Sequence, residues 1–206
     1  MVASQWALAI FAWGGVKAFF AHQAFIALAA AALCMIAMTP FTRGSFNPGD
    51  KEDRGNRWVI PALCCLAYAN SFISPLTDRL DLFTFGGDSS RWAGVALYAA
   101  GGALRLRAIF ALDRRFSGLV AIQDGHALET RGVYHVVRNP AYLGMLIHLL
   151  GWALTFRSLA GAAIVALVLI PLSARMRSEE RLLRLHFGAE YDDYFARTWR
   201  LIPWVY

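Results

Sequence analysis

Charged residues are scarce in this chain, making up 17% of its 206 residues, whereas hydrophobic residues make up 58%. A soluble domain carries charge on about a quarter of its residues. The charges present are gathered in short stretches that long apolar runs separate. This distribution argues against an ordinary soluble domain. It predicts an all-α integral membrane protein, with residues 1–206 forming a single membrane domain.

Cysteine is also rare, and the three cysteines lack the spacing of metal ligands. Because Cys34, Cys64 and Cys65 fall within apolar runs, we expect small buried side chains, no disulfide and no metal site. The Gly-rich loop that follows a strand in soluble nucleotide-binding folds is missing too. The net charge of +6 is not arranged as a basic stripe with interleaved aromatic residues, so we expect no nucleic-acid partner.

Five apolar runs are candidates for transmembrane helices, although the last two are short for a crossing, which needs roughly 17–25 residues. Gly101 and Gly102 lie within one run, where small residues let helices approach closely. The apolar stretch 5–16 is brief and contains two glycines, so it is either an interfacial helix or the start of a longer first span. The five candidates are 19–38, 58–76, 92–112, 142–156 and 158–174.

The positions of lysine and arginine predict how these helices are oriented. Fourteen of the 20 Lys and Arg residues lie in the connections 39–57 and 113–140 or in the tail from residue 175, and four lie in the alternate connections. Because basic loops stay on the cytoplasmic side, we expect the N-terminus outside and the C-terminus in the cytoplasm. We expect the membrane to be a bacterial inner membrane.

Residues 132–142 combine turn signals with polar side chains. Asn139 precedes a proline, which disfavours the helical region for it, and Pro140 suits the first turn of the next helix. Free backbone N–H groups at that helix start would suit an anion or a purine edge. The alternative is a simple membrane-entry loop, with Tyr134 and Tyr142 as interface aromatics.

A second polar group follows the last apolar run. Arg175 and Glu179 are four residues apart and share a helix face, so an ordinary ion pair worth about 0.3–0.5 kcal/mol is one interpretation. Two adjacent carboxylates, Glu179 and Glu180, beside Arg175 and Arg177 could instead bind a zwitterion. Two helices joined by a tight turn return the chain to the side it left. The two polar groups therefore predict one binding site at one membrane face.

Five short motifs follow one another in the second half of the chain. They are, in order, Gln123-x-x-His126-x-Leu128-x-Thr130-x-Gly132-Val133-Tyr134, Val137-Arg138-Asn139-Pro140-x-Tyr142-x-Gly144, Arg175-x-x-x-Glu179-Glu180, Phe187-Gly188-x-Glu190-Tyr191-x-x-Tyr194 and Ile202-Pro203. Their order resembles the isoprenylcysteine carboxyl methyltransferase family, to which the phospholipid N-methyltransferases are related, over roughly residues 101–204. The family often has histidine where this chain has Asn139, and asparagine cannot titrate near neutral pH.

The resemblance implies a methyltransferase of about five transmembrane helices that uses S-adenosylmethionine. Its cytoplasmic cofactor pocket would be formed by the 113–142 loop and the C-terminal helices. Residues 1–100 would be N-terminal spans, and 101–206 the methyltransferase core. Arg175 would be the catalytic residue facing the methyl acceptor, and Glu179 would bind the amino group of the cofactor. The other implied cofactor contacts are Gln123, His126, Ala127, Leu128, Glu129, Tyr134, Asn139, Pro140, Ala141 and Tyr142.

The expected acceptor is a lipophilic molecule that enters from the bilayer, so membrane lipids are the expected surroundings. An isoprenylcysteine-like or other lipid carboxylate is the first choice, because a carboxylate is ionised at neutral pH and needs no general base. A lipid amine or a small thiol is the alternative and needs a base, for which Glu180 or His126 are candidates.

Two further possibilities stay open in the sequence. A small anion-binding transporter or sensor would place an ionisable pair near the bilayer midplane. Arg105 and Arg107 lie near the inner end of the third apolar run, where an arginine is costly unless it is partnered. Both could contact the acceptor or the 113–140 loop. The sequence does not predict the oligomeric state.

Overall fold

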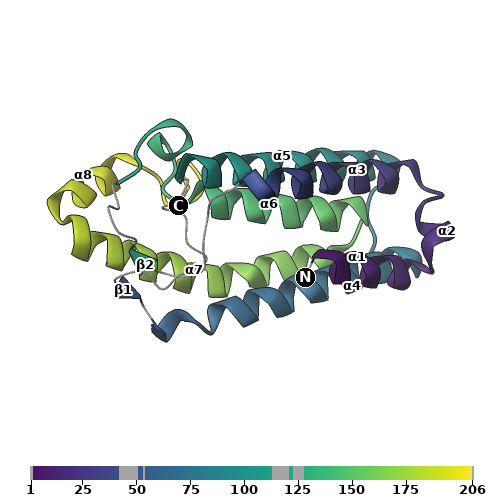
Figure 1. Cartoon of the computed structure of the whole chain (residues 1–206). Helices are drawn as coiled ribbons and strands as arrows, with labels where there is room; N and C mark the ends of the chain where they lie inside the picture. The colour runs from purple at the N-terminus through teal and green to yellow at the C-terminus, as the bar shows by residue number, and fades with distance from the viewer. Residues whose placement is uncertain (1, 42–50, 53, 113–120, 123–127, 206) are drawn as a thin grey trace.

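The structure is a computed structural model that describes residues 2–41, 51–52, 54–112, 121–122 and 128–205. These residues form a bundle of helices with one pair of very short antiparallel strands (Figure 1). The elements are α1 (Val2–Trp13), α2 (Val16–Phe19), α3 (Gln23–Met38), β1 (Lys51–Glu52), α4 (Val59–Arg79), α5 (Asp88–Leu112), β2 (Ala121–Ile122), α6 (Pro140–Thr155), α7 (Leu159–Phe187) and α8 (Ala189–Arg197), with 3-10 turns at Thr39–Phe41, Arg54–Asn56 and Gly132–His135.

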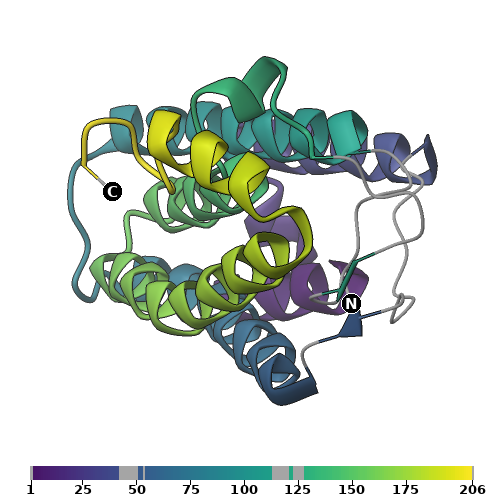
Figure 2. The ribbon, with the colours of Figure 1, turned by 90° about the vertical axis from the view of Figure 1, so that its left-hand side faces the viewer.

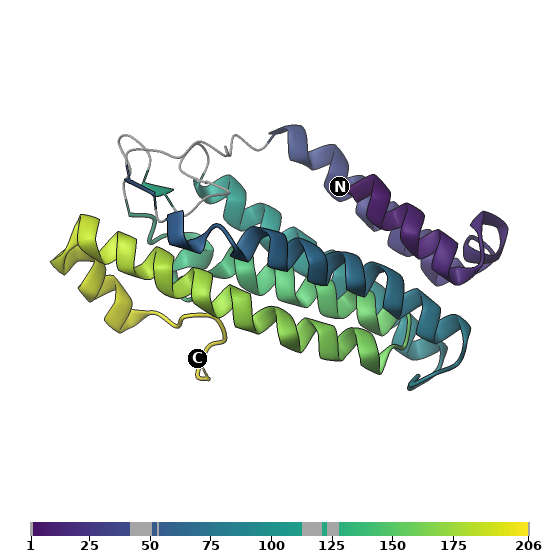
Figure 3. The same cartoon turned by 90° about the horizontal axis from the view of Figure 1, so that it is seen from below.

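Four helices are long and apolar enough to cross a membrane: α4, α5, α7 and the segment Gln23–Phe41. The shorter apolar helix α6 runs beside α5, so together they account for the five expected apolar runs. The stretch 5–16 is not the start of a longer first span, because α1 ends at Trp13 and the candidate span begins at Gln23. It falls largely within α1, a separate helix that packs along α4 and then turns back through α2 into α3 (Figures 1 and 3).

The three arginine-rich segments meet at one end of the bundle. Strands β1 and β2 join the connection 39–57 to the connection 113–140, and Asn56 Nδ2 donates to the carbonyl of Ala174 on α7 at 3.4 Å. Figure 2 looks at this end and shows α8 in front of the helices. The turns 14–22, 80–87 and 156–158 lie at the opposite end (Figure 1). The arginine-rich connections and the C-terminal tail therefore lie at the same end of the bundle, as the Lys and Arg counts predicted.

Close packing of α5 against α6 depends on four glycines, two from each helix. A Cβ at Gly101 would overlap the backbone nitrogen of His148, and a Cβ at Gly151 would overlap the backbone nitrogen of Tyr98. Gly94 and Gly144 face backbone of the opposite helix in the same way. The close approach expected at Gly101 is confirmed. The neighbouring Gly102 faces the side chain of Met35 on α3 instead.

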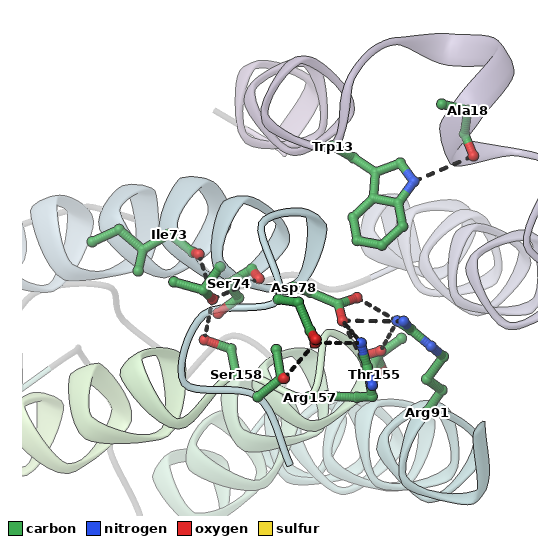
Figure 4. A network of polar contacts seen from close by, with 12 residues as sticks. Trp13, Ala18, Ile73, Ser74, Asp78, Arg91, Thr155, Arg157 and Ser158 are labelled. Carbon is green, nitrogen blue, oxygen red and sulfur yellow. Dashed lines mark hydrogen bonds and ion pairs between the residues drawn. The ribbon is translucent and has the colours of Figure 1, made fainter. Parts of the chain in front are cut away.

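A buried ion group ties the helices together at the far end (Figure 4). The carboxylate of Asp78 on α4 is fully buried and accepts from Arg91 NH2 at 3.1 Å and from Arg157 NH2 at 2.8 Å. Arg91 also donates to the carbonyl of Thr155 at 3.1 Å. The hydroxyl of Ser158 caps α7 by accepting from the backbone of Gly161. This group therefore links the last turns of α4 and α6 with the first turns of α5 and α7.

The cysteines do not lie where the sequence predicted. Cys34 and Cys65 are exposed on the bundle, and Cys64 is half-buried. An apolar run does not distinguish a side chain that packs inside a membrane bundle from one that faces lipid, because both are apolar. All three cysteines are free thiols in the structure.

The α5–α6 contact can be tested by replacing Gly101 with alanine. The added Cβ meets backbone that cannot move aside, so Gly101→Ala should lower the free energy of unfolding by about 1–3 kcal/mol. Gly102→Ala is the matched control, because its Cβ meets only the flexible end of Met35. Thermal unfolding in detergent measures both. Equal melting temperatures for the two variants would contradict the close backbone contact.

The ion group at the far end can be tested through Asp78. Asp78→Asn leaves two guanidinium groups without their shared carboxylate and should destabilise the protein by about 3–5 kcal/mol. Asp81→Asn is the control. The Asp81 side chain is 78% exposed, and its carboxylate oxygen lies 3.5 Å from Arg157 NH2, so this ion pair is weak. Its effect should stay within about 0.5 kcal/mol. A similar loss in both variants, measured by thermal unfolding, would argue against the special role of Asp78.

Candidate functional site

Tyr142, Arg175 and Glu179 form a cluster where α6 begins and α7 leaves the apolar part of the bundle; we call it the Tyr–Arg–Glu cluster. The Tyr142 hydroxyl donates to Glu179 Oε1 at 2.5 Å and accepts from Arg175 Nε at 2.5 Å. Arg175 Nε also lies 3.1 Å from Glu179 Oε1. The Arg175 side chain is 7% exposed and the Glu179 side chain 24%. The two polar motifs of the sequence therefore meet in space.

Local sequence explains why Tyr142 points at α7. Pro140 is the first residue of α6, as predicted, and Tyr142 lies in the first turn. Asn139 has φ −122° and ψ 55°, outside the helical region that a following proline disfavours. Its amide donates to the carbonyl of Arg200 at 3.0 Å, so it joins the start of α6 to the C-terminal segment.

Tyr134 fixes the loop that precedes α6. It is buried, and its hydroxyl donates to the carbonyl of Ala108 on α5 at 3.3 Å. Burial raises the pKa of the Tyr134 phenol, so the group stays a hydrogen-bond donor at all physiological pH values. Tyr194 on α8 donates to the backbone carbonyl of Tyr134 at 2.8 Å. Tyr134 therefore holds its loop between α5 and α8.

A second ion group anchors the C-terminal segment beside the cluster. Glu180 accepts from Arg200 NH2 at 2.7 Å and lies 3.4 Å from Arg138 Nε. Arg138 also donates to the carbonyl of Phe195 at 2.9 Å and lies over the Phe195 ring. The backbone of Arg138 donates to the carbonyl of Trp199 at 2.8 Å. Residues 195–200 are thereby held against the start of α6 and the end of α7.

The structure brings most of the sequence-predicted positions to this end of the bundle. Leu128 and Glu129 are half-buried, and a Glu129 oxygen accepts from the backbone of Arg131 at 3.1 Å. Ala141 is buried, and its carbonyl accepts from Arg105 NH1 at 3.1 Å. Three predicted cofactor contacts lie outside the described residues: Gln123, His126 and Ala127.

Sequence reasoning missed how several of these groups are used. Glu180 was a candidate base, but two guanidinium groups hold its carboxylate, so it has a structural role. Its partners are 42 and 20 residues away, and no local spacing predicts such pairs. Arg91 pairs with the buried carboxylate of Asp78, and no sequence motif indicated this pair. The sequence gave one reason to single out Arg105, which is that its charge lies within an apolar run.

The C-terminal anchor can be tested by removing the charge of Glu180. Glu180→Gln should release residues 188–205 from α7, because Arg138 and Arg200 lose their shared carboxylate. Trypsin cleavage after Arg197 or Arg200 should accelerate on the order of 100-fold through local opening. Asp192→Asn is the control, because the Asp192–Arg184 pair is exposed. Unchanged cleavage in Glu180→Gln would show that other contacts hold the segment.

Comparisons with known proteins agree on one family. A family model described as phospholipid methyltransferase matches residues 89–190. Protein-S-isoprenylcysteine O-methyltransferase B of Arabidopsis thaliana is 31% identical over 140 residues, which cover 65% of this chain and 71% of that protein. A probable protein-S-isoprenylcysteine O-methyltransferase of Oryza sativa subsp. japonica is 27% identical over 185 residues, covering 86% of this chain and 95% of that protein.

The fold has a solved counterpart. The structure of the eukaryotic intramembrane Ras methyltransferase ICMT (isoprenylcysteine carboxyl methyltransferase) matches with a TM-score of 0.54 and 21% identity, over 94% of this chain and 65% of that one. At this identity the match supports the membrane fold alone. Sequence relatives, family model and site motifs together lead to one conclusion: this chain is a membrane enzyme that belongs to the isoprenylcysteine carboxyl methyltransferase family.

Proposed function

We propose that the protein transfers a methyl group from S-adenosylmethionine to the carboxylate of an isoprenylcysteine-like lipid. The observation that carries this proposal is the Tyr–Arg–Glu cluster at the arginine-rich end of a membrane bundle. It combines one carboxylate and one guanidinium on a shared helix face, fixed by a tyrosine hydroxyl. The transporter or sensor alternative expected an ionisable pair near the middle of the bilayer. This cluster lies instead at the first turn of α6 and beyond the apolar part of α7.

The chemistry of the donor set fits S-adenosylmethionine. The Glu179 carboxylate, three-quarters buried and held by Tyr142 and Arg175, suits the ammonium of the cofactor. Glu129 and Tyr134, two of the positions that the family resemblance assigns to the cofactor, lie on the segment that precedes α6. The bound cofactor supplies a methyl group already activated by the sulfonium. The protein therefore needs no nucleophile or metal of its own for this step.

The residues of this chain bind and orient the reactants, and they exclude water from the site. Arg175 would hold the acceptor carboxylate, because its guanidinium presents five N–H donors in a fixed fork. Tyr142 restrains Arg175 by accepting from its Nε and so sets the direction of that fork. Tight burial of Arg175 keeps water from the acceptor carboxylate, and alignment in a dry site accelerates transfer.

The orientation in the membrane is part of the proposal. The arginine-rich end would face the cytoplasm, with the N-terminal side of the first span outside. The acceptor would reach the cluster from the bilayer, because its lipid part is soluble there. A bacterial inner membrane stays a prediction from the sequence, and the relatives named above are plant proteins.

Phospholipid amine methylation is the second candidate, supported by the description of the matching family model. An amine acceptor must lose a proton, so it needs a general base. Of the two proposed bases, Glu180 is occupied by Arg138 and Arg200, and His126 lies outside the described residues. A carboxylate acceptor requires no such group, which favours the first proposal.

Cofactor binding can be tested with Glu179→Gln. The variant loses the charge that would pair with the cofactor ammonium, so its affinity for S-adenosylmethionine should fall on the order of 10–100-fold. Asp193→Asn, an exposed carboxylate change on α8, is the control and should bind like the parent. Calorimetry on the folded, detergent-purified protein measures both. Parental affinity in Glu179→Gln would refute the role of Glu179.

Acceptor methylation can be tested with Arg175→Gln. The variant should bind the cofactor within a few-fold of the parent but methylate a prenylcysteine carboxylate at least about 100-fold more slowly. Arg181→Gln, further along the same helix and exposed, is the control. The assay follows labelled methyl into lipid and then treats the product with base, because a methyl ester is base-labile and a methylated amine is stable. A base-stable product from the parent would favour the amine alternative.

A further inference from the structure

A cavity lies at the far end of the bundle, away from the Tyr–Arg–Glu cluster. It has a volume of about 370 Å³ and lies between the turn that joins α1 to α2 and the last turns of α4. Its described lining is mostly apolar, and Arg79 is the charged residue in it. The other lining residues that matter are Phe11, Gly14, Gly15, Phe72 and Leu76.

Arg79 has no carboxylate partner within the described ranges of the chain. Its guanidinium makes one hydrogen bond there, a long one of 3.5 Å from NH1 to the carbonyl of Ala12 at the end of α1. The two carboxylates closest to it in sequence, Asp78 and Asp81, both lie against Arg157 instead. Because a guanidinium has five N–H donors, most of the donors of Arg79 can reach an anion from solvent or lipid.

The turn between α1 and α2 is shaped to receive this guanidinium. A Cβ at Gly14 would lie 3.1 Å from Arg79 Cζ, so a side chain there would crowd it. Gly14 and Gly15 have φ values of 110° and 104°, a backbone region that favours glycine. Lys17 follows in α2, is exposed, and likewise has no ion pair among the described residues. Two positive charges without carboxylate partners therefore lie on or near this turn.

The depth of the cavity matches the boundary between lipid headgroups and acyl chains. Arg79 is the last residue of α4, a helix apolar enough to cross a membrane. Arginine at such a position reaches the headgroup layer. Phe72 and Leu76 precede it by seven and three residues, so they lie deeper in the apolar layer. Phe11 is 73% exposed and adds apolar surface at the same cavity. A cation above an apolar surface is complementary to a phospholipid.

We propose that this cavity binds an anionic phospholipid, whose phosphate contacts Arg79 and whose acyl chain lies against Phe72 and Leu76. Guanidinium binds phosphate through charge-assisted hydrogen bonds, often two at once. A choline headgroup carries its own cation, which Arg79 and Lys17 would repel, so the site should prefer an anionic headgroup. The bound lipid would bridge α4 and the turn after α1. This inference does not depend on the proposed methyl transfer.

A purely structural role of Arg79 predicts something different. If Arg79 only ties α4 to the carbonyl of Ala12, its replacement lowers the stability equally whichever phospholipid is present. If Arg79 contacts the phosphate, its replacement removes the preference for an anionic lipid. The ratio of affinities for an anionic and a zwitterionic phospholipid with identical acyl chains separates the two roles.

The experiment uses the full chain, freed of lipid in detergent, and measures bound phospholipid by native mass spectrometry. The probes are phosphatidylglycerol, phosphatidylcholine with the same acyl chains, and glycerol phosphate as a headgroup without a chain. The parent should bind phosphatidylglycerol about tenfold more tightly than phosphatidylcholine. Arg79→Gln should lose about tenfold in affinity for phosphatidylglycerol and keep its affinity for phosphatidylcholine. Arg107→Gln, an exposed arginine change on α5 outside the cavity lining, should behave like the parent.

Each outcome decides a part of the proposal. Equal affinities of the parent for the two phospholipids overturn the preference for an anion. Glycerol phosphate that binds as tightly as phosphatidylglycerol shows a site for free phosphate and overturns the lipid. An Arg79→Gln variant with the parental preference overturns the contact. Where Arg79→Gln fails to fold, Arg79→Lys decides, because it keeps the charge and loses the fork. Its affinity for phosphatidylglycerol should fall several-fold, and an unchanged affinity overturns the contact.

Discussion

The close contact of α5 with α6 is the constraint on which the functional end depends. Four glycines let the two backbones touch, and this distance brings Arg105 and Ala108 of α5 to residues 134–142. Side chains of ordinary size in the contact would push α6 outward. Tyr142 would then move away from α7, because it lies in the first turn of α6. The glycines therefore act on the site through backbone distance, although none of them touches it.

Ion groups complete the positioning at both ends of the bundle. At the far end Asp78 gathers two arginines, and at the functional end Glu180 gathers two others. In each group one buried carboxylate satisfies two guanidinium groups from different elements, so a turn or tail is fixed to the helices. Such pairs are costly to bury and costly to break. The two ion groups therefore fix the positions of the helices relative to one another, which apolar contacts alone specify less precisely.

Much of this structure could be predicted from the sequence because some signals are local. Apolar runs marked the helices, Pro140 marked the start of α6, and the four-residue spacing of Arg175 and Glu179 put them on one face. Pairs distant in sequence gave no such signal. Arg200 meets Glu180 only because α8 folds back after Gly188, where the backbone has a φ of 55°. The sequence left two arrangements open for the stretch 5–16, because a short apolar stretch of twelve residues fits both.

Charge balance gives the strongest reason to prefer an anionic acceptor. Within the Tyr–Arg–Glu cluster, Glu179 neutralises Arg175. If the ammonium of a bound cofactor engages Glu179, the guanidinium of Arg175 has less negative charge beside it than before. A carboxylate acceptor would restore the balance, whereas a cationic amine would add to the repulsion. Cofactor and acceptor would then support each other's binding through Glu179 and Arg175, which lie one turn apart on α7.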